Sequence, residues 1–101
     1  MKKIFENNKL IAIFIPRPVN KNKTKFYTDG NENLQAGRVI KKKSEMILPH
    51  KHTPKQRIIK DTSEFLYFEK GSAEICVYNK KNKIIHKFIL KKGDAIIFFD
   101  C

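Results

Sequence analysis

The apolar residues of this chain come in short runs, and none of the runs has the spacing of an amphipathic helix. Turn-forming polar residues separate them, and no internal repeat is present. The runs rich in Ile, Leu, Phe, Val and Tyr are 10–15, 34–40, 64–69, 73–78, 84–90 and 94–99. Short strands at regular intervals, divided by turns, are typical of β-sandwiches and β-barrels. The sequence therefore predicts an all-β fold.

Two parts of the chain interrupt this pattern. The run 10–15 is followed by Pro16 and Pro18, and proline cannot donate a hydrogen bond to a sheet, so we expect a first or edge strand there. Residues 19–33 are rich in Asn and Lys and predict a loop. Further along, 56–60 has strand character and 61–63 predicts a turn.

The length of 101 residues predicts one small domain, 1–101, with an N-terminal strand and loop at 1–33 and the core at 34–101. Cys76 and Cys101 have neither metal-type nor disulfide-framework spacing, and Cys76 fits a small core residue. The run 10–15 is too short for a signal core or a membrane span. We expect a soluble, cytoplasmic protein without a membrane partner.

The formal net charge is +12, and only three of the 22 basic residues are Arg. Such a charge can indicate an anionic small molecule, a membrane surface or a nucleic acid. It also fits the plain composition of a chain rich in Lys, Ile, Asn and Phe. Nucleic-acid binding needs aromatic side chains among the basic ones, and 23–27 is the only local hint of this. A nucleic-acid partner is therefore the last of the alternatives.

Two histidines, His50 and His52, are separated by a single residue. In an extended strand such residues point to the same face, which suits a metal ion. Glu64 opens the next strong strand pattern and would add a carboxylate. Two histidines and one carboxylate can hold a metal and leave coordination positions open. The alternative is a pair of surface histidines, flanked by Lys51 and Lys55.

The pattern of these residues resembles the first conserved motif of the cupins. The motif has His-x-His and then a Glu followed after six residues by Gly, and Glu64 and Gly71 stand at that spacing. The Gly93-Asp94 pair looks like the turn that leads into the second cupin motif. The resemblance covers about 34–101. It implies a cupin-type jelly-roll barrel or sandwich.

The chain departs from the cupin pattern in two places. Eleven residues separate His52 from Glu64, where the commonest form of the motif has only a few. The chain also ends at Cys101, before the histidine of the second motif. The resemblance thus implies a jelly roll that is incomplete at its C-terminal edge. An open edge invites pairing with another chain, so we expect a homodimer.

The resemblance also implies a function. His50, His52 and Glu64 would hold a divalent ion, Fe, Mn, Ni or Zn, which would act on or bind an oxygen-bearing small molecule. Substrate contacts would come from Gln56, Arg57 for an anionic group, and Tyr67. Tyr78 would pack in the core or at the rim, and His86 would be a core histidine or replace the missing ligand. Neither residue is therefore counted among the predicted site residues.

Small bacterial cupins of this appearance include sugar and sugar-nucleotide isomerases or epimerases of surface-polysaccharide biosynthesis, and dioxygenases. The alternatives are a non-enzymatic module that binds a small ligand and a truncated, inactive copy. Bound metal and measurable turnover would separate the first reading from the other two.

Overall fold

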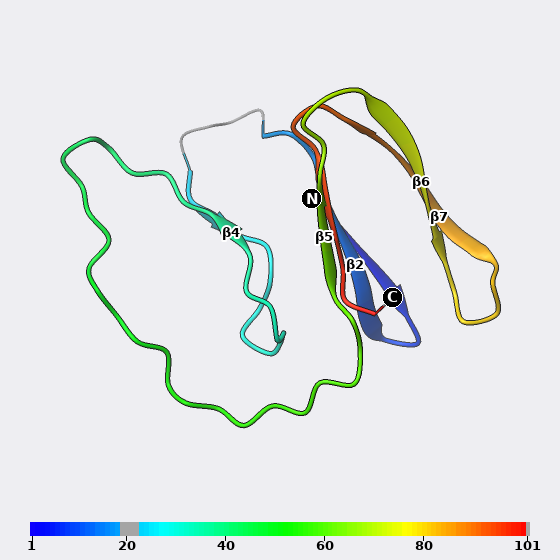
Figure 1. Cartoon of the computed structure of the whole chain (residues 1–101), viewed down its shortest axis with the longest axis horizontal. Helices are drawn as coiled ribbons and strands as arrows, with labels where there is room; N and C mark the ends of the chain where they lie inside the picture. Colours follow the sequence, from blue (N-terminus) through cyan, green and yellow to red (C-terminus); the bar gives the residue numbers. More distant parts are fainter. Residues whose placement is uncertain (19–22, 101) are drawn as a thin grey trace. The chain divides into compact units, whose positions relative to one another are not determined.

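The computed structural model describes residues 1–18 and 23–100, and all regular structure in this part of the chain is β-strand (Figure 1). The strands are β1 Lys2–Glu6, β2 Lys9–Ile15, β3 Lys25–Phe26, β4 Gly37–Arg38, β5 Glu64–Tyr67, β6 Ser72–Tyr78, β7 Ile84–Lys91 and β8 Ala95–Phe98. Every pairing among them is antiparallel. The predicted all-β class is confirmed.

The chain divides into two compact units. The described parts of 1–19 and 61–101 form the first unit, and those of 20–60 form the second. The single-domain organisation stays a prediction.

A four-stranded sheet in the order β1-β2-β8-β5 forms one layer of the first unit. β8 lies inside this sheet, where Ala95, Ile96 and Ile97 are almost completely buried. A strand that is covered on both faces needs a continuous apolar run, which is what this segment provides. The predicted strands 64–69 and 94–99 are confirmed in these positions.

The prediction that 10–15 is a first or edge strand is wrong. β2 pairs with β1 on one side and with β8 on the other, and the two prolines simply follow its end. The missed strand is β1, which joins β2 through Asn7 and Asn8. Both asparagines have positive φ, 50° and 64°, as a two-residue type I′ hairpin turn requires. An Asn-Asn pair between the apolar residues Ile4-Phe5 and the run 10–15 was the available sequence signal.

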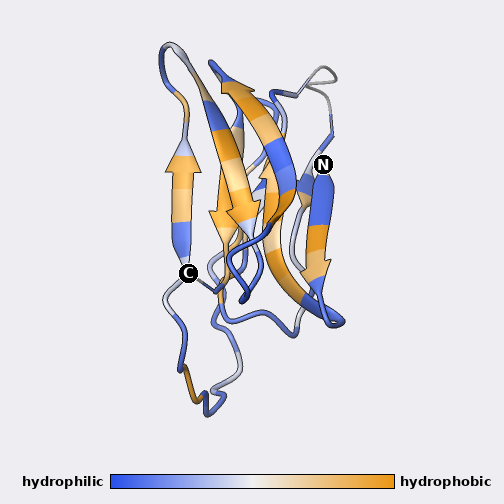
Figure 2. Ribbon diagram, turned by 90° about the vertical axis from the view of Figure 1, so that its right-hand side faces the viewer, coloured by the Kyte–Doolittle hydropathy of each residue, from blue (hydrophilic) through white to orange (hydrophobic). Residues whose placement is uncertain are grey.

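The hairpin of β6 and β7 forms the second layer of the first unit and lies alongside the sheet that contains β2 and β5 (Figure 1). Hydrophobic stretches lie along the strands, and the connecting loops are mostly hydrophilic (Figure 2). Val77 on β6 clusters with Ile4, Ile11 and Ala12 of the sheet, and the ring of Phe88 stacks on Phe14 with centroids 4.6 Å apart. These contacts place the core between the two layers.

A bulge in the β1–β2 pairing helps to fill that core. Ile4 pairs with Ala12 and Phe5 with Leu10, so Ile11 is an extra residue in β2. An extra residue bends the strand and changes where neighbouring side chains point. As a result Ile11 and Ala12, although adjacent, both belong to the buried cluster.

The Gly93-Asp94 pair forms the turn between β7 and β8. Gly93 has a φ of 91°, which an L-residue rarely adopts. The Asp94 carboxylate accepts hydrogen bonds from the backbone N–H of Lys91 at 2.9 Å and of Arg17 at 2.7 Å. The backbone groups of Phe68 bond to this same turn, at 2.8 and 2.9 Å. The turn thus joins three separate segments of the first unit.

The second unit contains the two-residue strands β3 and β4 and otherwise irregular backbone. Thr28 is buried; its hydroxyl accepts the N–H of Ala36 and donates to Gln35. The Gln35 amide donates to the carbonyls of Asp29 and Glu32. Local side-chain bonds of this kind offer the backbone an alternative to a sheet.

Two predicted strands are corrected by this arrangement. The strand at 34–40 is reduced to Gly37–Arg38, and 56–60 has no strand structure. Ile58 and Ile59 remain 78% and 63% exposed. Strand propensity reflects packing on a pleated surface, and residues without such a surface do not form a sheet.

Candidate functional site

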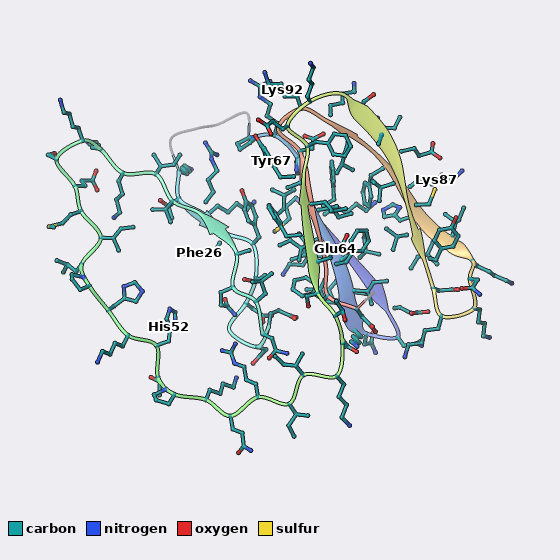
Figure 3. The ribbon with its side chains drawn as sticks, viewed as in Figure 1. Phe26, His52, Glu64, Tyr67, Lys87 and Lys92 are labelled. Carbon is teal, nitrogen blue, oxygen red and sulfur yellow. The ribbon has the colours of Figure 1, made fainter. Side chains whose placement is uncertain are left out.

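His50 and His52 lie in the second unit, on a long loop in which no residue from 39 to 63 belongs to a strand. The prediction that they share the face of a strand is therefore wrong. Their rings are nevertheless neighbours, with centroids 5.4 Å apart and planes inclined by 65°. Both side chains are exposed, and Figure 3 shows His52 on this loop. The pair is the strongest candidate for a site in the second unit.

A backbone hydrogen bond defines the proton position on one of the rings. Nδ1 of His50 lies 3.1 Å from the carbonyl oxygen of Leu48. A carbonyl oxygen can only accept, so Nδ1 must carry the proton in this bond. In the neutral ring, Nε2 then keeps its lone pair. Metal-binding histidines commonly have this second bond to a carbonyl, which orients the ring.

Glu64 is the first residue of β5 in the first unit, where it pairs with Phe98 (Figure 3). The predicted strand start is confirmed, and the side chain is exposed. Within neither unit do three or more His, Cys, Asp or Glu side chains among the described residues gather closely enough to hold a metal ion. The role of Glu64 as a ligand stays a prediction.

The three predicted substrate residues are divided between the units. Gln56 and Arg57 lie on the loop of the second unit, and the Arg57 guanidinium donates to the carbonyl of Asn33 at 2.6 Å. Tyr67 is the last residue of β5 in the first unit and is 59% exposed. Arg57 is thus engaged in a structural bond within its own unit. The binding roles of all three residues stay predictions.

His86 and Cys76 both lie on strands of the first unit. His86 is half-buried on β7. Its ring packs edge-on against the ring of Phe88, with centroids 4.6 Å apart, as expected for an inward-facing histidine. Cys76 is half-buried rather than in the core, because it lies on the opposite side of β6 from the buried Val77. Cys101 lies outside the described residues.

The first unit contains a polar hollow that sequence reasoning missed. Its volume is about 210 Å³, and it is lined by Glu6, Asn7, Lys9, Ile11, Lys80 and Asp100. The Lys9 ammonium binds the carboxylates of Asp61 at 2.9 Å and Asp100 at 3.1 Å, and these hydrogen bonds raise the Lys9 pKa above 10.5. The partners are far apart in sequence, so no local pattern could have indicated them.

No protein family, curated protein or solved structure matches this chain. The part of the chain that the structure describes also contains no helix long and apolar enough to cross a membrane. The resemblance to the cupins therefore stays a prediction from sequence motifs.

Proposed function

We propose that this chain is a small cupin-type protein that binds a divalent metal ion through His50 and His52 and uses it to bind an oxygen-bearing small molecule. The observation that carries the proposal is the imidazole pair, with ring centroids 5.4 Å apart and the Nδ1 proton of His50 directed to a carbonyl. The jelly roll itself is part of the proposal, and the antiparallel all-β structure supports it.

The two rings are suited to a shared ion. Imidazole nitrogens bind Zn²⁺ at about 2.0–2.1 Å, so two ligating nitrogens must come within about 4 Å of each other. Rings with centroids 5.4 Å apart would reach this by turning a nitrogen of each ring toward a shared ion. Imidazole donors suit Zn, Fe and Ni. Affinity order alone does not determine which metal is bound, so the supply of each metal in the cell decides between these three and Mn.

An ion held by two histidines keeps most of its coordination positions for other ligands. Glu64 would fill one of them, as the sequence predicts, and a ligand oxygen another. The bound ion would supply Lewis-acid polarisation of that oxygen. Lys51 and Lys55 are exposed beside the histidines and favour an anionic ligand. A sugar or sugar nucleotide fits this description, with isomerisation, epimerisation or dioxygenation as the candidate reactions.

The second candidate is a non-enzymatic module that binds a small ligand. The observation that favours it is the hollow of about 210 Å³ in the first unit, where Lys9, Lys80, Glu6 and Asp100 present both signs of charge. Such a module would bind a small ligand without metal, and it would show no turnover. A homodimer is proposed for either function, since β5 pairs on one side only.

Metal content, measured by elemental mass spectrometry on tag-free protein, tests the proposal. We expect near-stoichiometric metal in the parent and loss of it in His50→Ala/His52→Ala. His86→Gln is the matched control. It removes the remaining histidine of the chain, which lies on β7, and should leave the metal in place. Glu64→Gln should weaken Zn²⁺ binding about tenfold or more if this carboxylate is a ligand.

Two results would contradict the proposal. One is little metal in the parent after growth in supplemented medium. The other is metal that survives the double substitution, since the ion would then sit elsewhere in the chain. Folding of each variant is checked by circular dichroism, so that loss of metal is not confused with loss of structure.

A further inference from the structure

We propose that the loop 41–60 of the second unit binds the surface of an anionic lipid bilayer. This loop contains the largest group of exposed apolar side chains in the second unit. Those with the greatest exposure are Met46 at 73%, Ile47 at 57%, Leu48 at 71%, Ile58 at 78% and Ile59 at 63%. Exposed apolar side chains that gather in one segment mark interaction sites more often than scattered ones do.

The length and backbone of the loop point in the same direction. No residue from 39 to 63 belongs to a strand or helix. Loops of this length without regular structure are uncommon in compact domains and are usually functional when ordered. The turn Lys42–Glu45 closes with a backbone bond of 3.0 Å, and the next three residues are the apolar Met46, Ile47 and Leu48. The first apolar group thus follows directly from a defined turn.

The charge of the loop indicates the kind of partner. Seven basic residues and one acidic residue fall within it, and the acidic one, Glu45, lies 4.0 Å from Lys41 and also accepts the N–H of Lys42. The basic residues are Lys41, Lys42, Lys43, Lys51, Lys55, Arg57 and Lys60. An exposed surface with this excess of positive charge attracts an anionic partner.

Among anionic partners, the apolar side chains favour lipid. Single-stranded nucleic acid is bound by aromatic rings that stack on the bases, and the five apolar residues here are all aliphatic. A second copy of the same loop would bring the same positive charge and be repelled. Aliphatic side chains enter the boundary between head groups and acyl chains, while lysines remain at the anionic head groups. A long basic loop with two aliphatic groups fits this division.

This inference is independent of the metal proposal, and it revises one expectation from the sequence. We expected no membrane partner because no run is long enough to span a bilayer. Binding at a surface does not need a span, since a few apolar side chains and several basic ones are sufficient.

The chain has no tryptophan, which permits a direct test. Leu48→Trp places a fluorophore in the first apolar group, and Ile89→Trp places one at a similarly exposed position on β7, where Ile89 is 62% exposed. The full-length proteins are mixed with vesicles of phosphatidylcholine alone and with vesicles that also contain phosphatidylserine. We expect a blue shift for Leu48→Trp with the anionic vesicles only, and no shift for Ile89→Trp.

Co-sedimentation with the same vesicles tests the residues that carry the binding. Removing one lysine near a lipid surface should weaken partitioning about fivefold, so Lys43→Gln/Lys51→Gln/Lys55→Gln should weaken it about 100-fold. The matched control is Lys80→Gln/Lys81→Gln/Lys83→Gln on the β6–β7 turn, which should have a much smaller effect. Leu48→Ser/Ile58→Ser should also reduce binding while leaving the charge unchanged.

Three results would overturn the inference. The first is no binding to anionic vesicles at low salt, and the second is equal loss with both lysine triplets. The third is retained binding with no fluorescence shift for Leu48→Trp, since attraction by charge alone would not insert the apolar group. All of these measurements are made in EDTA, so that a metal ion on His50 and His52, which lie in the same loop, adds no charge to the surface, and the result is separate from that of the metal test.

Discussion

The two-layer packing of the first unit can be tested with one pair of neighbouring residues. Leu90 on β7 is completely buried, whereas Ile89 beside it is 62% exposed on the opposite side of the strand. Truncation of a buried Leu to Ala removes its transfer free energy and leaves a cavity, at a cost of 2.7–5.0 kcal/mol in measured series, so about 3 kcal/mol is expected here. Ile89→Ala creates no cavity and should cost about 0.5–1 kcal/mol.

Guanidinium chloride unfolding followed by circular dichroism measures both variants on the full chain. With a denaturant slope of roughly 3 kcal/mol/M, Leu90→Ala should lower the midpoint by about 1 M and Ile89→Ala by about 0.3 M or less. A shift of the β6–β7 register by one residue would exchange the inward and outward side chains. Equal effects, or a larger effect of Ile89→Ala, would therefore refute the observed register and the packing derived from it.

Substitutions at two positions and one titration test individual features of the first unit. Gly93→Ala forces an L-residue to a φ of 91° and should cost about 1–2 kcal/mol, seen as a lower thermal midpoint; an unchanged midpoint would contradict the turn geometry. Asn8→Ala should cost about 1 kcal/mol because Asn8 has a φ of 64°, whereas Asn8→Gly should be tolerated, and the two are compared by thermal unfolding. The pKa of Lys9 is raised by its hydrogen bonds to Asp61 and then Asp100, so its contribution to stability is fully present below pH 10.5 and is lost as pH rises through the higher folded-state value. An NMR titration of the Lys9 side chain should give a midpoint above 10.5, and a midpoint at or below that value would contradict the interaction.

Much of the strand content followed from local sequence. The runs at 73–78, 84–90 and 94–99 became β6, β7 and β8 because apolar or alternating residues are bounded there by turn formers. The polar residues between the runs 73–78 and 84–90 form a turn, as expected, and the Asn79 side chain accepts the N–H groups of Lys81 and Lys83. These features depend on residues close in sequence, which is why a pattern can predict them.

The candidate site was predicted only in part. The neighbouring positions of His50 and His52 keep their rings together, at 5.4 Å, even though the strand predicted to align them is absent. Spacing of one residue limits how far two side chains can separate. The bond of His50 to the Leu48 carbonyl could not be read from the residues, since it depends on the backbone path of the loop.

Local sequence is enough to predict the all-β class, the positions of the longer strands and the closeness of the two histidines, because each depends on period-two patterning, turn residues or chain connectivity. Which strands are neighbours follows only from the folded structure. β8 lies between β2 and β5, and Lys9 meets Asp61 and Asp100 across long stretches of chain. Such pairings are selected by the burial of one apolar layer against another, a property of the whole folded unit that no local run of residues contains.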